Sequence, residues 1–256
     1  MKRDVLKDST QPGSWDRLWS DRHELAPWDY LSHIIFSHVA QRCPAEKSDF
    51  VLEAGSGSGR ISARLLDHGH RVCQMDNSIK SLRFNQKRWG CRSPLFAGDL
   101  RAMPFRDGVF RVVWSSGVLE HFRGGDLAGI LIELGRTVKS GGLLISLVPY
   151  AHCAPYRVAK WILEKTSLWA YGREEPLRTL RNPSEQGGLE VVSEYTIAFS
   201  ALGIQNAQYI PGIRPVGRWL GRLACRLYDS GLLRWYDQWS SRIFGGYLLV
   251  SIARKR

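Results

Sequence analysis

The most constraining feature of the sequence is a glycine-rich turn between an apolar run and an amphipathic stretch. Gly55, Gly57 and Gly59 alternate directly after the apolar run 50–54, and a helical pattern over 60–68 follows them. Glycines at alternate positions let the backbone approach a ligand closely and adopt positive φ angles. Because open α/β sheets bind ligands beyond the carboxyl ends of their strands, the turn predicts a small-molecule site at the end of the first strand.

Apolar runs and amphipathic stretches alternate through the first 150 residues. Strands are expected at 50–54, 71–76, 94–97, 110–115 and 143–148, and helices at 60–68, 77–89 and 127–138, the last ending at the turn 140–142. This alternation predicts βαβ units with right-handed crossovers. With further strands expected at 205–210 and 247–253, the fold class is a doubly wound, mainly parallel seven-stranded α/β sheet of the Rossmann-like type.

The length of 256 residues suits a single domain. The organisation we expect is N-terminal cap helices within 1–47, a core over 48–150, and substrate or lid insertions at 151–187 and 211–244. The stretch 189–202 predicts a core helix, although its β-branched residues also allow a strand.

Acidic residues follow the expected strands at informative places. Asp76 ends the second strand, 21 positions beyond Gly55, which suits a carboxylate that accepts hydrogen bonds from ribose hydroxyls. Glu53 precedes the glycines, where an acid repels a pyrophosphate but accepts from an ammonium group. Asp99 is positioned to accept from the amine of an adenine ring, with Leu100 as an apolar neighbour. The alternatives are a tight turn of purely structural role and an ordinary loop aspartate beside glycine.

Taken together, these motifs resemble the class I S-adenosylmethionine (SAM)-dependent methyltransferases. The resemblance covers roughly 48–150 and rests on VLEAGSGSGR at 51–60, Asp76, GDLRAMPFRDGVFRVVWSSGVLEHF at 98–122 and the turn at 139–142. More narrowly, the chain resembles the type 11 branch, which includes ubiquinone and menaquinone methyltransferases. The family often has Asp where Glu53 stands.

The resemblance implies SAM as the cofactor and S-adenosylhomocysteine as the product. In the family the first loop contacts the methionine part, the acid after the second strand holds the ribose, and the later Asp contacts adenine. The implied cofactor-binding residues are Glu53, Gly55, Ser56, Gly57, Gly59, Asp76, Asn77, Asp99, Leu100 and Ser116.

Catalytic candidates are fewer, because methyl transfer from a sulfonium depends mainly on alignment. A dedicated base matters only when the nucleophile carries a proton. His121 is a candidate base; the alternative is that it organises the cofactor pocket, since many type 11 relatives carry the Glu120-His121 pair whatever their substrate. Tyr150 and His152, after the fifth expected strand, are candidate substrate contacts, and His152 also fits an exposed loop histidine. No metal site is expected.

The net charge of +12 is concentrated near the end of the chain, where 211–256 holds nine basic and two acidic residues. Arg214, Arg218, Arg222 and Arg226 recur every fourth residue opposite an apolar helix face. Such a helix fits shallow binding to an anionic membrane surface. The alternative is a solvated arginine face over ordinary core packing.

Three functions follow, in decreasing order of expectation. The first is methyl transfer to a small-molecule or lipid-like acceptor at a membrane surface. The second is methylation of RNA or DNA, which the charge permits but which the Ser-Ser-Gly end of the fourth strand disfavours. The third is a non-catalytic SAM-binding scaffold. No apolar run approaches the roughly 20 residues of a membrane span, and the polar start and scattered cysteines favour a cytoplasmic location.

Overall fold

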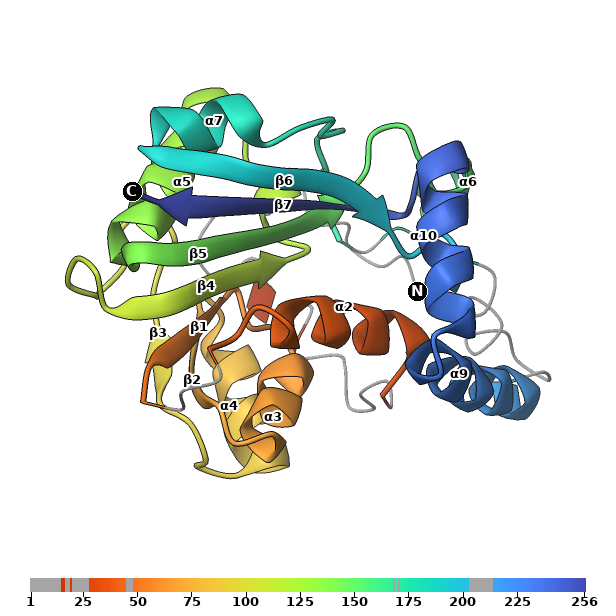
Figure 1. The fold of residues 1–256 in the computed structure, drawn as a ribbon, viewed down its shortest axis with the longest axis horizontal. Helices are drawn as coiled ribbons and strands as arrows, with labels where there is room; N and C mark the ends of the chain where they lie inside the picture. The colour runs from red at the N-terminus through yellow and green to blue at the C-terminus, as the bar shows by residue number, and fades with distance from the viewer. Residues whose placement is uncertain are drawn as a thin grey trace.

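The computed structural model describes residues 15–16, 19, 28–44, 48–167, 169, 171–202 and 214–256. These residues form one seven-stranded sheet flanked by helices on both faces (Figure 1). In spatial order its strands are β3 (Leu95–Ala97), β2 (Arg71–Asp76), β1 (Phe50–Ala54), β4 (Phe110–Ser116), β5 (Val138–Pro149), β7 (Leu248–Lys255) and β6 (Leu189–Ile197). β1 to β5 pair in parallel, whereas β7 runs antiparallel to both of its neighbours. The predicted doubly wound, mainly parallel seven-stranded sheet is confirmed.

The helices connect the strands in the order that the sequence pattern predicts. They are α2 (Tyr30–Ala40), α3 (Arg60–Asp67), α4 (Ile79–Trp89), α5 (Gly124–Thr137), α6 (Ala154–Lys165), α7 (Arg181–Gln186), α9 (Arg214–Asp229) and α10 (Leu232–Phe244), with a 3₁₀ turn η1 at Leu119–His121. α2 and α3 cover one face of the sheet, together with buried residues of α9, and α5 covers the other (Figure 1).

The central strand β4 shows how the two faces share the core. Val112 and Trp114 join the cluster under α2 and α3, whereas Val113 joins the cluster under α5. Side chains alternate between the faces of a strand, so a strand covered on both faces is apolar at nearly every position. This is why the middle of β4, Val112–Trp114, is apolar at every position.

The prediction of a core helix over 189–202 is wrong. Leu189–Ile197 forms β6, which pairs with β7 from Leu189 opposite Lys255 to Ile197 opposite Leu248. The β-branched residues of this stretch fit a pleated surface, and as a strand they cover the backbone edge of β7. The strand expected at 205–210 lies outside the described residues, and β6 takes its place in the sheet.

β5 also begins earlier than expected, because the turn predicted at 140–142 is part of the strand. Pairing with β4 shifts register between Phe110 opposite Val138 and Val112 opposite Leu143. Within this irregularity a Cβ at Gly142 would lie 2.7 Å from the carbonyl oxygen of Arg111. A glycine is therefore needed where the backbones approach most closely.

The described parts of the two expected insertions carry helices, of which α6, α9 and α10 lie at the carboxyl edge of the sheet and α7 at the opposite edge beside α5 (Figure 1). α6 and α7 lie between β5 and β6, and α9 and α10 lie between β6 and β7. Asp237 of α10 fixes the second insertion, since its carboxylate accepts from the amides of Ala198 and Ser200, each at 2.9 Å, and from Ser200 Oγ at 2.6 Å. Ala198 has a φ of +67°, a conformation that these hydrogen bonds stabilise.

Replacing this carboxylate is expected to destabilise the fold. Asp237→Ala leaves two backbone donors without their acceptor, which costs about 2 kcal/mol of unfolding free energy. Chemical denaturation followed by circular dichroism measures the change. Gln238→Ala, at the exposed neighbouring position, is the control and is expected to stay within about 0.5 kcal/mol of the parent chain. Equal stability of the two variants would contradict the role of Asp237.

Candidate cofactor and acceptor site

The loops that follow β1, β2, β3 and β4 meet at the carboxyl edge of the sheet around a cavity of about 450 Å³. Most residues that the resemblance assigns to the cofactor line this cavity: Glu53, Gly55, Ser56, Gly57, Asp76, Asn77, Asp99, Leu100 and Ser116. Gly59 is the assigned residue that does not. The structure therefore brings together groups separated by up to 63 positions in the sequence.

The glycine loop is held by backbone hydrogen bonds and by the absence of side chains. The amides of Gly55 and Ser56 donate to the carbonyl oxygen of Met75 at 2.8 and 3.0 Å. A Cβ at Gly55, where φ is +80°, would lie 2.5 Å from a methyl carbon of Val118. Gly59 supports the loop from behind, since a Cβ there would lie 2.4 Å from the side-chain oxygen of Gln74.

Asp76 joins the first two loops. Its carboxylate accepts from the amide of Gly57 at 2.7 Å and from the amide of Ser78 at 2.8 Å. Burial raises the pKa of Asp76, and the two amide donors oppose that shift. The carboxylate also lines the cavity, so it is placed for the ribose-binding role that the resemblance implies.

Glu53 and Arg60 give the cavity a carboxyl group and a guanidinium near the glycine loop. Glu53 accepts a hydrogen bond from Ser62, and burial raises the pKa of Glu53 to about 8, with Asp76 adding to the shift. Arg60 lines the cavity and pairs with Asp29 at 3.1 Å. The carboxylate of Glu53 can pair with the ammonium of an amino-acid group, and the guanidinium of Arg60 can pair with its carboxylate. Sequence reasoning missed Arg60, although it follows the last glycine directly.

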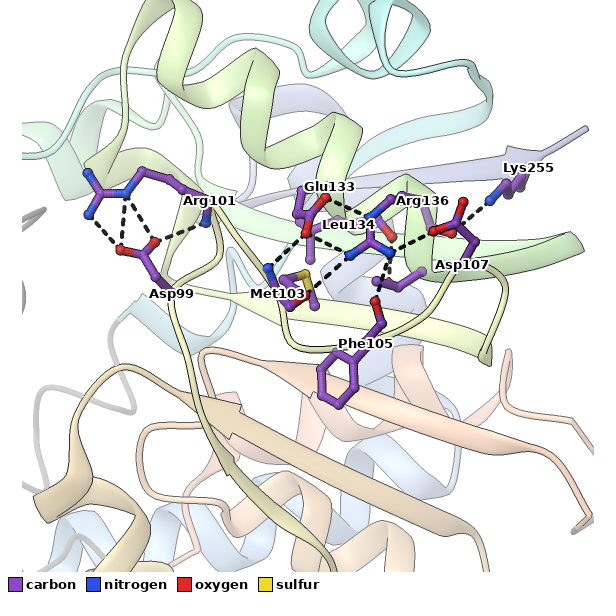
Figure 2. A network of polar contacts seen from close by, with 10 residues as sticks. Asp99, Arg101, Met103, Phe105, Asp107, Glu133, Leu134, Arg136 and Lys255 are labelled. Atoms are coloured by element: carbon purple, nitrogen blue, oxygen red, sulfur yellow. Dashed lines mark hydrogen bonds and ion pairs between the residues drawn. The ribbon is translucent and has the colours of Figure 1, made fainter.

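Asp99 lines the cavity, but its carboxylate already has a partner on the same loop. Arg101 donates from Nε to Oδ1 at 3.0 Å and from Nη2 to Oδ2 at 2.6 Å, as Figure 2 shows. These hydrogen bonds hold the pKa of Asp99 below its ordinary value. The carboxylate is thus ionised and oriented, and an adenine amine would share it with Arg101.

The rest of this loop is anchored on α5 by Arg136 (Figure 2). Its guanidinium donates to Glu133, to Asp107 at 2.7 Å and to the carbonyl oxygen of Phe105 at 2.7 Å. Glu133 in turn accepts from the amide of Met103 at 2.8 Å. The segment that carries Asp99 and Leu100 is therefore fixed by a helix on the far side of the sheet from α3.

Two tryptophans from the N-terminal segment also line the cavity. The Trp15 ring lies edge-on to His121, with ring centroids 5.0 Å apart. A Cβ at Gly57 would lie 3.2 Å from the Trp19 ring. The described residues of the expected N-terminal cap thus contact both the glycine loop and the loop after β4.

The three catalytic candidates do not come together. His121 lines the cavity with Nδ1 at 2.9 Å from the carbonyl oxygen of Arg173. Burial, helped by Lys160, lowers the pKa of His121 to about 4, so the ring is neutral near neutral pH. Tyr150 and His152 pack on each other, with ring centroids 5.5 Å apart, and line no part of the cavity.

A set of lining residues that sequence reasoning missed comes from η1, the first insertion and the start of β7. We call Glu120, Tyr156, Glu174 and Tyr247 the acceptor wall. Tyr156 donates to Glu174 at 2.7 Å, and the rings of Tyr156 and Tyr247 have centroids 4.7 Å apart. The sequence signals for this wall are the Glu120-His121 pair, considered above for the cofactor pocket, and the enrichment of aromatic residues in 151–187, which does not say which of them face a cavity.

The comparisons with known proteins agree with this geometry. Residues 52–146 match a family model described as a methyltransferase domain. Malonyl-[acyl-carrier protein] O-methyltransferase of Salmonella typhimurium is 35% identical over 94 residues, which cover 37% of this chain and 36% of that protein. Demethylmenaquinone methyltransferase of Streptomyces avermitilis is 32% identical over 123 residues, which cover 46% of this chain and 51% of that protein.

The chain therefore spans between about a third and a half of the length of these curated relatives. Among solved structures, geranyl diphosphate C-methyltransferase of Streptomyces coelicolor A3(2) has a TM-score of 0.58 over 99% of this chain and 88% of that chain, at 14% identity. This last likeness is one of fold. Sheet order, cofactor motifs and the family match over residues 52–146 together identify a class I SAM-dependent methyltransferase domain in this chain, with SAM as its cofactor.

Proposed function

We propose that the chain is an enzyme that transfers the methyl group of SAM to a small-molecule acceptor. The observation that carries the proposal is a single cavity lined both by the cofactor residues and by the acceptor wall. When bound, SAM supplies an activated methyl group with a good leaving group. Asp76 would hold the ribose, and Glu53 with Arg60 would hold the amino-acid part. The wall would then orient an acceptor beside the cofactor, where alignment supplies much of the rate.

The lining of the cavity favours a small acceptor over a nucleic acid. Aromatic rings and the carboxyl groups of Glu120 and Glu174 contribute to it. Apolar and aromatic walls suit small ligands, whereas the phosphates of RNA or DNA are bound mainly by basic side chains, and Arg60 is the only lysine or arginine among the described lining residues. The arginines of α9 lie outside this cavity.

Loss of the Asp76 carboxylate is expected to weaken cofactor binding strongly. Asp76→Ala removes the acceptor for ribose hydroxyls and loosens the glycine loop, so affinity for SAM and S-adenosylhomocysteine should fall about a hundredfold or more. Calorimetric titration measures both affinities, and a melting curve confirms folding. Asp67→Ala, which breaks a surface pair with Arg92, is the matched control and should bind as the parent chain does. Unchanged affinity in a folded Asp76→Ala variant would contradict the site.

Cofactor affinity is also expected to depend on pH through Glu53. Because the pKa of Glu53 in the free protein is about 8, the group is mostly protonated at lower pH, and binding an ammonium requires it to ionise. The affinity for SAM should therefore rise by at most about tenfold per pH unit between about pH 6 and about pH 8. Calorimetry in buffers of different ionisation enthalpy would also report proton release. Glu53→Gln should flatten this dependence; an unchanged slope would assign it to another group.

We further propose that the enzyme acts at an anionic membrane surface through α9 and α10. The two helices contact each other and expose large apolar side chains: Trp235 is 65% exposed, Leu232 63% and Trp219 56%. Arg218, Arg222 and Arg226 are exposed on α9, whereas the side chain of Arg214 lies outside the described residues. Interfacial tryptophan beside arginine favours shallow insertion among anionic headgroups.

The described helices include none that is long and apolar enough to cross a membrane. Membrane association through α9 and α10 would therefore be peripheral. It supports a lipid-like acceptor, which would reach the cavity without passing through water. A cytoplasmic location stays a prediction.

Vesicle flotation tests the membrane proposal. The parent chain should float with vesicles that contain phosphatidylserine, and Arg218→Glu with Arg222→Glu should float several-fold less, because each basic residue near the surface contributes about 1 kcal/mol. Arg83→Glu with Lys87→Glu changes the charge equally on α4, away from these helices, and should float as the parent does (Figure 1). Equal flotation of the two double variants would contradict a role of Arg218 and Arg222 in membrane binding.

A further inference from the structure

We propose that the acceptor wall binds a protonated amine, so that the acceptor of the proposed methyl transfer is an amine. The inference rests on the proposed function, since it names the chemical class of acceptor for the same cavity. Three independent features of the wall carry it: its charge, an unsatisfied buried oxygen and its aromatic rings.

The wall is acidic. Glu120 and Glu174 both line the cavity, and both are almost fully buried. Arg60 is the only lysine or arginine among the described residues that line the cavity. It lies at the start of α3, beside the glycine loop, and pairs with Asp29. A ligand with a positive charge would compensate these carboxyl groups, whereas a carboxylate or diphosphate would be repelled.

The nearby cations neutralise the wall only in part. Lys160 pairs with Glu164, and Arg157 lies 4.0 Å from Glu174 while also donating to the carbonyl oxygen of Pro149 at 3.2 Å. Neither Lys160 nor Arg157 lines the cavity. One carboxyl group, that of Glu120, thus has no cation within the distance of an ion pair among the described residues.

Glu120 also has an unused hydrogen-bond acceptor. Among the described residues, its buried Oε2 has no hydrogen-bond partner. A buried polar atom without a partner costs about 1–3 kcal/mol, which a ligand can recover by donating a hydrogen bond. An ammonium group offers up to three donors, so it can satisfy Glu120 and Glu174 at the same time.

Aromatic rings complete a site for a cation. Tyr156 and Tyr247 are packed at 4.7 Å, and Trp169 and Tyr171, which also line the cavity, are packed at 5.3 Å. The faces of aromatic rings attract cations, most strongly where water is excluded. Lys160 already lies 5.0 Å from the centre of the Trp169 ring, so one face of that ring serves a cation within the protein itself.

The wall would also take the proton that an ammonium must lose before its nitrogen can act as a nucleophile. The proton moves from the ammonium nitrogen to one carboxylate of the Glu120 and Glu174 pair, which leaves a neutral amine with its lone pair and a protonated carboxyl group. Burial raises the pKa of both glutamates, and each is further raised by a neighbouring glutamate. A carboxylate with a raised pKa is a better proton acceptor near neutral pH.

Binding of matched probes tests the inference without requiring turnover. The parent chain, with and without saturating S-adenosylhomocysteine, is titrated with phenethylamine, phenethyl alcohol and phenylacetate, and with an alkyl set of the same three end groups. The amine of at least one set should bind about tenfold or more tightly than its alcohol, and the carboxylate most weakly. An alcohol or carboxylate that binds as tightly as the amine in both sets, or no binding of either amine, overturns the inference.

Substitutions then locate the effect. Glu174→Gln keeps the shape of the side chain and should lower amine affinity about tenfold, with the affinity for S-adenosylhomocysteine unchanged. Glu190→Gln removes an exposed glutamate that pairs with Arg256 and does not line the cavity, and should leave both affinities unchanged. Equal amine affinity in the parent chain and a folded Glu174→Gln overturns the inference. Failure of the parent chain to bind S-adenosylhomocysteine would instead overturn the proposed function.

Discussion

The Asp76 carboxylate is the interaction on which the cofactor half of the molecule depends. It accepts from the amide of Gly57 in the first loop and from the amide of Ser78 in the second, so the ends of β1 and β2 form one rigid corner. Two loops are tied to this corner by backbone hydrogen bonds: the glycine loop donates to the carbonyl oxygen of Met75, one residue before Asp76, and Gly98 of the third loop donates to the carbonyl oxygen of Asp76 at 3.1 Å. A short acid at the end of β2 thus organises the loops before any ligand binds.

The cofactor-binding half can be predicted well from the sequence, because its residues belong to short, continuous sequence patterns. A glycine run, an acid at the end of the next strand and alternating apolar runs are each short patterns with one physical meaning, and sheet topology then brings them to one edge. The sheet class, the strands β1 to β4 and most of the residues assigned to the cofactor follow from these patterns. Arg60 was missed although it adjoins the pattern, because its role appears only when the cavity beside it is seen.

The acceptor half is less predictable because its residues have no shared period or spacing. Glu120, Tyr156, Glu174 and Tyr247 come from four places in the chain and meet through packing of the first insertion against η1 and β7. The same limit explains β6, whose apolar pattern fits a helix and a strand equally until its pairing with β7 decides between them. It also explains Tyr150 and His152, which follow β5 as expected but turn toward each other.

The antiparallel course of β7 has a consequence for how such a chain can diversify. Ile197 at the end of β6 lies opposite Leu248 at the start of β7, and Pro149 at the end of β5 lies on the other side of Leu248. The connection with α9 and α10 therefore leaves and re-enters the sheet through one paired position, as the loop of a hairpin does. Another connection at this place keeps the register of β6 and β7 if it covers the sheet face that Ala224 and Tyr228 of α9 cover now. The segment proposed to bind a membrane can therefore change in evolution separately from the residues that hold the cofactor.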